Sequence, residues 1–218
     1  MIFVNFKTYK EGTGKRAVQL VHELCDCETE SGVPVIPVVQ LVDARACVEA
    51  SDSEVWVQHV DGVEYGQHTG WILPEAVAEA GIKGTFLNHS EHKMANSKWQ
   101  IANSRCQKAR LQTLIFASDL EELKQIVEAK PTYVVYESPE LIASPTTSVS
   151  RSKPEIITEA AKIAQKAGIP LIVGAGVKDV EDIKKSLELG AAGVAVSSSV
   201  VLAQDPKSVV LNLAKGFR

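Results

Sequence analysis

An amine, an imidazole and a carboxylate stand at the ends of three different apolar runs of this sequence. Lys7 follows the first run together with Asn5, His89 follows the fourth, and Glu137 ends the sixth. If these groups meet in one site, they can move protons beside a carbonyl group. Such a meeting requires a fold that brings the ends of distant strands together.

The apolar runs form a regular series of eight short segments rich in β-branched residues. They lie near residues 2–6, 34–39, 54–59, 84–88, 112–116, 132–136, 170–174 and 193–196. The segments between them carry apolar residues at helical spacing. Runs that are apolar throughout, such as Leu171-Ile172-Val173, are typical of parallel strands buried on both faces.

This alternation predicts one α/β domain over residues 1–218, a (β/α)8 barrel. In such a barrel the carboxyl ends of the strands converge on one face, and that face carries the chemistry. We therefore expect Asn5, Lys7, His89 and Glu137 to share a site there.

The composition argues against nucleic acid and membranes as partners. The chain has 45% hydrophobic and 23% charged residues, as ordinary globular proteins do, and its net charge of −4 gives no general attraction to nucleic acid or membrane lipid. It starts with a strand-like run rather than a signal peptide, and no apolar stretch approaches the ~20 residues of a membrane span. Four cysteines without a C-x-x-C pair suggest reduced thiols, and hence a cytoplasmic protein.

Neither a metal nor an organic cofactor is expected. No cluster of His, Asp and Glu has the spacing of metal ligands in this sequence. Gly174-Ala175-Gly176 resembles the start of a dinucleotide-binding fingerprint, but Asp179 stands where the third glycine is needed.

Two segments near the C-terminus are candidates for binding an anion. The glycines of Gly174-Ala175-Gly176 permit close backbone approach to a ligand, and Ser197-Ser198 opens a short helical turn with free N–H groups. The alternative is that both segments are ordinary tight turns. Residues 60–70 and 138–150 form longer loops, which in compact barrels are usually lids or contact surfaces.

Several motifs, taken in order along essentially the whole chain, resemble the triosephosphate isomerase family in its compact archaeal form. The main ones are Asn5-Phe6-Lys7, Asn88-His89-Ser90-Glu91 and Tyr136-Glu137-Ser138-Pro139-Glu140-Leu141-Ile142. Further matches are Gly66-Gln67-His68-Thr69-Gly70, Lys153-Pro154-Glu155 and Gly174-Ala175-Gly176-Val177. Each motif alone is weak, but their order and strand positions together are specific.

The resemblance implies interconversion of dihydroxyacetone phosphate and glyceraldehyde 3-phosphate. It makes Glu137 the base that moves a proton between adjacent carbons, and His89 a neutral imidazole that polarises the carbonyl. Lys7 becomes a fixed positive charge paired with Glu91, and Asn5 a donor to a substrate oxygen.

The resemblance also implies a phosphate site and a subunit contact. The substrate phosphate would meet the segments after the seventh and eighth strands and a lid after the sixth. The residues expected there are Ile142, Ala143, Gly174, Ala175, Gly176, Ser197 and Ser198. Thr69 matches a loop residue that enters a partner subunit, so a homo-oligomer, a dimer or a tetramer, is expected.

The sequence departs from the family at the phosphate site. The lid usually reads Ile-Gly-Thr-Gly, but Ala143 and Pro145 replace the two glycines here, and Ser199 stands where a glycine is usual. A smaller departure is His92, in place of Arg or Asn. Proline has no N–H, and losing one hydrogen bond to a charged group costs on the order of 1.5–3 kcal/mol. We expect lid closure and phosphate affinity to be affected rather than the acid-base chemistry.

Two other functions remain open at this point. Other phosphate-binding barrel enzymes, such as those similar to thiamine-phosphate synthase or phosphoribosylanthranilate isomerase, share the pattern after the last two strands. Lys7, His89 and Glu137 together argue against them. A barrel that binds sugar phosphates but has impaired turnover, because of its altered lid, is the non-catalytic alternative.

Overall fold

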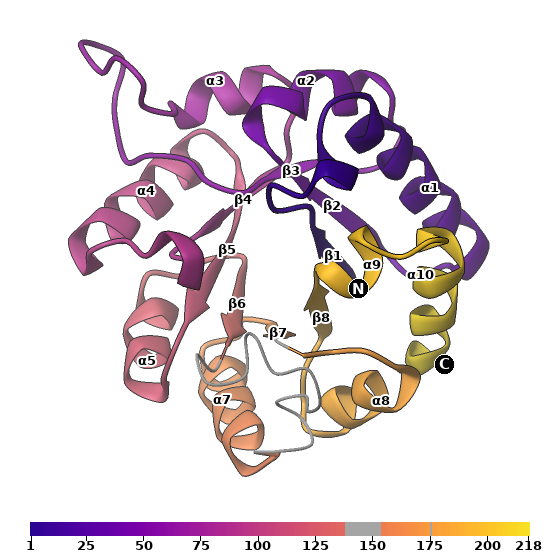
Figure 1. Cartoon of the computed structure of the whole chain (residues 1–218). Coiled ribbons are helices and arrows are strands. Elements are labelled where there is room, and N and C mark those ends of the chain that lie inside the picture. Colours follow the sequence, from indigo (N-terminus) through magenta and orange to yellow (C-terminus); the bar gives the residue numbers. More distant parts are fainter. Residues whose placement is uncertain (138–153, 175) are drawn as a thin grey trace.

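The computed structural model describes residues 1–137, 154–174 and 176–218, and its parallel strands close into a barrel in chain order (Figure 1). The strands are β1 (Ile2–Asn5), β2 (Val35–Val39), β3 (Trp56–Val57), β4 (Gly84–Leu87), β5 (Gln112–Ala117), β6 (Tyr133–Tyr136), β7 (Leu171–Gly174) and β8 (Gly193–Val196). The first strand pairs with the last, Phe3 lying opposite Ala195. The predicted barrel is confirmed.

Helices follow the strands and surround the barrel (Figure 1). They are α1 (Lys15–Ser31), α2 (Leu41–Glu49), α3 (Pro74–Glu79), α4 (Asn96–Lys108), α5 (Leu120–Glu128), α7 (Pro154–Lys166), α8 (Val180–Glu188), α9 (Ser198–Val201) and α10 (Pro206–Ala214). Short 3₁₀ helices are η1 (Lys10–Gly12), η2 (Ser90–His92) and η4 (Lys215–Phe217). Among the described residues no helix is long and apolar enough to cross a membrane.

The strand β3 is shorter than the predicted 54–59. Its ladder with β2 ends where Val57 meets Val39, the last residue of β2. Gln58, directly after it, uses its side chain to bind the backbone carbonyl of Lys7 at 2.9 Å. The strand β3 therefore ends where β2 ends. Gln58, the next residue, points its side chain toward the segment after β1.

The barrel interior is filled by aromatic and aliphatic side chains and is not a pore. Phe3 packs edge-on against Trp56, with ring centroids 5.1 Å apart, and Phe86 packs similarly against Phe116 at 5.0 Å. Gly84 faces the Trp56 ring so closely that a Cβ would lie 2.4 Å from it, so no larger residue fits. These packed side chains support the carboxyl ends of the strands, where the polar side chains lie.

The segment between β3 and α3 protrudes from the barrel (Figure 1). It contains the predicted 60–70 loop, and residues 64–71 are exposed, Thr69 and Trp71 among them. The other long loop, 138–150, lies outside the described residues.

The four cysteines are free thiols, and three of them are buried. Burial raises the pKa of Cys27 to about 11 and those of Cys47 and Cys106 to about 12. A buried thiol that stays protonated is unreactive, so these residues serve packing.

Candidate active site

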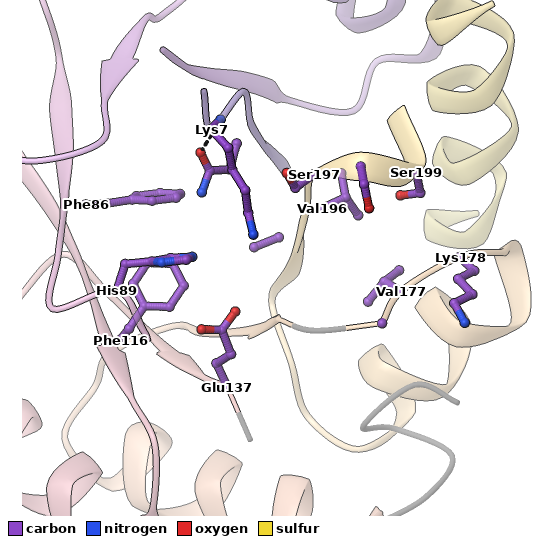
Figure 2. A pocket seen from close by; sticks show the side chains of 14 residues that line it. Lys7, Phe86, His89, Phe116, Glu137, Val177, Lys178, Val196, Ser197 and Ser199 are labelled. Atoms are coloured by element: carbon purple, nitrogen blue, oxygen red, sulfur yellow. Dashed lines mark hydrogen bonds between the residues drawn. The ribbon is translucent and has the colours of Figure 1, made fainter. Parts of the chain in front are cut away.

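A cavity of about 140 Å³ opens at the carboxyl ends of the strands (Figure 2). Its described lining comes from the ends of β1, β4, β5, β6 and β8 and from the segments that follow them and β7. These lining residues are Asn5, Lys7, Phe86, His89, Phe116, Glu137, Gly176, Val177, Lys178, Ala195, Val196, Ser197, Ser198 and Ser199. The four residues that the strand pattern predicted to meet therefore do meet here.

Lys7 is held by an unusual backbone and by an ion pair. Its φ of 46° lies in the left-handed region, which costs energy for a non-glycine residue and persists where neighbours hold it. Its N–H donates to Asn5 Oδ1 at 3.0 Å, and Gln58 donates to its carbonyl. Its Nζ donates to Glu91 Oε1 at 2.6 Å, as the resemblance implied. The ammonium is thus fixed at the cavity and partly neutralised.

Asn5 is 7% exposed, and its amide orientation is set by two donors. The Lys7 N–H and the Gln58 side chain, at 3.3 Å, both donate to its Oδ1. This leaves the NH₂ group as the part of the amide that can donate to a ligand, which suits the expected role. Gln58 is a supporting residue that the sequence pattern did not reveal.

His89 caps the short helix η2, and that cap determines which ring nitrogen carries the proton. The backbone N–H of Glu91 donates to His89 Nδ1 at 3.1 Å. A nitrogen that accepts a hydrogen bond has a free lone pair, so the proton of the neutral ring is on Nε2. His89 therefore presents an N–H donor rather than an acceptor.

Burial lowers the pKa of His89 below its ordinary value of 6.5. The carboxylates of Glu137 and Glu91 partly oppose this shift, whereas Lys7 and Lys93 reinforce it. The ring also lies edge-on to Phe116, with centroids 4.7 Å apart, which adds to its desolvation. The imidazole is accordingly neutral at pH 7.

The segment that carries His89 is anchored by Asn88, whose φ is 60°. Its side chain donates to the Phe116 carbonyl at 2.8 Å and to Glu122 Oε1 at 2.7 Å, and its Oδ1 accepts from the Met94 N–H at 3.0 Å. These contacts join β4 to β5 and α5 behind the imidazole. The sequence carried no signal for this role of Glu122, because Asn88 lies 34 residues before it in the chain.

Glu137 directly follows β6, and its carboxyl group is almost completely enclosed. The residue is 8% exposed, and its Oε2 has no hydrogen-bond partner among the described residues. A buried carboxylate oxygen without a hydrogen-bond partner is costly unless it serves a function. Figure 2 shows this group facing the space beside His89 and Lys7. An oxygen placed in this way can accept a proton from a bound ligand.

Of the predicted anion-binding residues, Gly176, Ser197 and Ser198 line the cavity, and Ser197 lies across it from His89 (Figure 2). Gly176 has a φ of 77°, which favours glycine. The internal bonds of α9 begin at Val200, whose N–H donates to the Ser197 carbonyl, so the N–H groups of Ser198 and Ser199 precede them. Ser197 Oγ is buried without a hydrogen-bond partner in the described structure.

The other residues predicted for the site do not line the cavity or lie outside the described residues. Gly174 is buried, and a Cβ there would lie 3.1 Å from Val135; it supports the site without appearing among the residues that line the cavity. Ile142, Ala143 and Ala175 lie outside the described residues, as does the departure at Pro145. Thr69 is exposed on the protruding segment and does not line the cavity.

His92, the smaller departure from the family pattern, lies beside the site rather than in it. Its ring is 4.3 Å from that of His59, whose Nε2 is 3.3 Å from Asp61 Oδ1. Burial lowers the pKa of His59. Among the described residues no group of three or more His, Cys, Asp and Glu has the geometry of a metal site.

Comparison with known proteins identifies the relatives of this chain. The triosephosphate isomerase family matches residues 1–116, and the family of the thiazole biosynthesis protein ThiG matches residues 143–218. The second match includes β7 and β8. It covers less than half of the chain.

Three relatives named triosephosphate isomerase match over nearly the whole length. The protein of Methanocaldococcus jannaschii is 33% identical over 217 residues, covering 99% of both chains. That of Thermoplasma volcanium is 37% identical over 214 residues (98% of this chain, 99% of the relative), and that of Methanopyrus kandleri 37% over 220 residues (99% and 97%). A family match over more than half of the chain and these full-length relatives show that the chain belongs to the triosephosphate isomerase family.

Proposed function

We propose that this chain interconverts dihydroxyacetone phosphate and glyceraldehyde 3-phosphate with Glu137 as the base, His89 as the electrophile and Lys7 as the fixed cation. Membership of the family makes the chain a triose-phosphate isomerase of glycolysis and gluconeogenesis. The observation that best supports these residue roles is the tautomer of His89. Its Nδ1 accepts from the Glu91 N–H, so Nε2–H is the donor in the cavity that Glu137 and Lys7 share.

The proton balance of the reaction assigns one task to each group. Glu137 takes a proton from C1 of dihydroxyacetone phosphate, and the electron pair moves onto the carbonyl oxygen O2. His89 Nε2 gives its proton to O2 and then takes one from the hydroxyl on O1. Glu137 returns its proton to C2, which leaves an aldehyde at C1 and a hydroxyl at C2. Both side chains end in their starting states, as catalysis requires.

Charge develops on the substrate oxygens in the enediolate, and the site contains groups positioned to meet it. Lys7 Nζ and the NH₂ of Asn5 supply a positive charge and a donor that are already in place before reaction. Preorganised donors stabilise a transition state without the cost of reorienting water. Glu91 holds the lysine in position and reduces the cost of leaving it partly buried.

For the phosphate we propose Gly176, Ser197 and Ser198 as backbone contacts, with Gly174 shaping the end of β7. Ile142, Ala143 and Ala175 complete the proposed set from the family pattern. Glycine at position 176 lets the backbone approach the phosphate closely. We further propose that the reaction uses no metal or organic cofactor, that nucleic acid is not a partner, and that the protein works in the cytoplasm.

The direct test treats the protein with EDTA and then measures its turnover of glyceraldehyde 3-phosphate in a coupled assay. We expect full activity without added metal, because the roles above need only side chains of this chain. Activity that disappears with EDTA and returns with metal would contradict the cofactor-free mechanism. Binding of phosphate ligands without turnover would favour the sugar-phosphate-binding alternative instead.

We also propose that the chain forms a homo-oligomer, a dimer or a dimer of dimers, through the protruding 61–70 segment. Tyr65 and Thr69 of that segment are exposed, as is Trp71 directly after it. This supports the proposal, since aromatic side chains are enriched at contacts between proteins.

The substitution Thr69→Arg should weaken association and activity together, because it adds a charge and bulk to the proposed contact. Light scattering would measure the mass, and the coupled assay the activity. Thr29→Arg on α1, also at an exposed threonine, is the matched control and should change neither. A fully active wild-type monomer at micromolar concentration would contradict the proposal.

A further inference from the structure

One carboxylate outside the cavity binds both ends of the segment that carries His89. Glu122 lies in the first turn of α5, and its side chain is 16% exposed. At one end of the segment, the Asn88 side chain donates to Glu122 Oε1 at 2.7 Å. At the other end, Lys93 Nζ donates to Oε1 at 3.0 Å and to Oε2 at 2.9 Å. Glu122 does not itself line the described part of the cavity.

This carboxylate is in turn fixed to the end of β5. The backbone N–H and the hydroxyl of Ser118, the residue after that strand, each donate to Glu122 Oε2 at 2.7 Å. Burial alone would raise the pKa of Glu122, but hydrogen bonds from Ser118, Lys93 and Asn88 outweigh it and lower the pKa below the ordinary value of 4.5. The group is therefore ionised at pH 7 and accepts from all of these donors at once.

The groups between the two bound ends are those that the reaction needs. The Glu91 N–H donates to His89 Nδ1 at 3.1 Å, and Glu91 Oε1 accepts from Lys7 Nζ at 2.6 Å. Both contacts depend on the path of the backbone from residue 88 to residue 93. The only helix in that stretch is η2, a single 3₁₀ turn of three residues. A turn this short is not stable by itself, so contacts at its ends must hold it in place.

We propose that Glu122 is a positioning residue of the reaction. By binding Asn88 and Lys93 it fixes the segment that directs His89 Nε2–H into the cavity and places Glu91 against Lys7. The inference rests on the proposed function and extends the machinery to a residue of an outer helix.

A second contact limits what loss of Glu122 can do. The Met94 N–H donates to Asn88 Oδ1 at 3.0 Å, and Asn88 also donates to the Phe116 carbonyl at 2.8 Å. These bonds keep the segment attached to the barrel without Glu122. Removing the carboxylate should therefore loosen the segment rather than detach it.

The test compares Glu122→Gln with Glu121→Gln. Both residues lie in the first turn of α5, and Glu121 pairs at the surface with Lys124, so each variant removes one paired charge from the same turn. Glutamine at position 122 keeps the length of the side chain, but its NH₂ group cannot accept from the donors around it. For Glu122→Gln we expect kcat for glyceraldehyde 3-phosphate to fall about ten- to hundredfold, with KM within about twofold. Glu121→Gln should have wild-type kinetics.

Nitrogen-15 NMR of the imidazole separates positioning from a loss of stability. In Glu122→Gln the contact between the Glu91 N–H and His89 Nδ1 should weaken, so the proton of the neutral ring is shared between both nitrogens. The shifts of Nδ1 and Nε2 should then move toward each other at pH 7. A variant that is only less stable keeps the wild-type shifts at temperatures well below its Tm. Wild-type kcat or wild-type shifts of His89 in Glu122→Gln would overturn the proposal.

Lys93→Gln tests the other end of the segment and remains informative if Glu122→Gln does not fold. The Lys93 side chain is 40% exposed, so its loss should cost the fold little. We expect kcat to fall about three- to tenfold. In the double variant the loss should be smaller than the product of the two single losses, because both changes remove one contact. Unchanged kinetics of Lys93→Gln, or losses that multiply in full, would overturn the proposal.

Failure of this inference can be distinguished from failure of the proposed function. Wild-type protein that does not turn over glyceraldehyde 3-phosphate would contradict the function. In that case the spectra of His89 still compare Glu122→Gln with Glu121→Gln. A change confined to Glu122→Gln would support the positioning role, and equal spectra of the two variants would overturn it.

Discussion

The substitution Glu137→Gln is expected to lower kcat for triose phosphates by a factor of about 10²–10⁴, with little change in KM. Glutamine keeps the shape of the side chain but cannot accept a proton at the carbon. The enclosed Oε2 has no hydrogen-bond partner among the described residues, so the substitution breaks no hydrogen bond of that atom there. A coupled assay in both directions would measure the loss.

Two further variants sharpen the test of the base. Glu137→Asp keeps a carboxylate but withdraws it by one methylene, so its loss should be intermediate. Glu121→Gln, on the exposed face of α5 where it pairs with Lys124, removes the same charge away from the cavity and should be neutral. Normal turnover by Glu137→Gln would remove the proposed base.

The second large effect is expected at His89, where His89→Gln should lower kcat by about 10²–10⁴, the range for one lost proton-transfer group. The glutamine amide can donate a hydrogen bond but cannot exchange a proton between two oxygens. Loss of kcat with KM nearly unchanged would indicate a role in the transition state. The same kcat in both proteins would contradict the assignment.

The lowered pKa of His89 also predicts how the charge of the ring and the stability of the fold depend on pH. Burial favours the neutral ring, so the wild-type ring should stay neutral until the pH falls below the ordinary pKa value of 6.5. Because the unfolded chain binds this proton more readily, the stability that the neutral ring contributes is present above about pH 6.5. It is lost as the pH falls toward the folded pKa.

Nitrogen-15 NMR of the imidazole can test both the protonation state and the tautomer. We expect a neutral ring with the proton on Nε2 at pH 7, since Nδ1 accepts from the Glu91 N–H. His22, an exposed histidine on α1, serves as an internal reference in the same spectrum. A ring of His89 that is already charged at pH 7 would contradict both the burial argument and its proposed role.

The local pattern of the sequence was sufficient to predict the strands and helices. It was also sufficient to predict which strand ends meet. Short β-branched runs, as at Leu171–Gly174, are typical of parallel strands buried on both faces, and the alternating helices supply the crossovers. Eight such units close into a barrel, and closure alone brings Lys7, His89 and Glu137 together. The family resemblance added the Lys7–Glu91 pair, and the structure contains it.

The tertiary structure decided the states of those residues. The tautomer of His89 depends on one backbone N–H, and the desolvation of Glu137 depends on the surrounding side chains. The orientation of Asn5 depends on Gln58, which is distant in sequence. Sequence periodicity reports which face of an element is buried, whereas protonation and orientation depend on contacts between distant segments, which exist only after the barrel has closed.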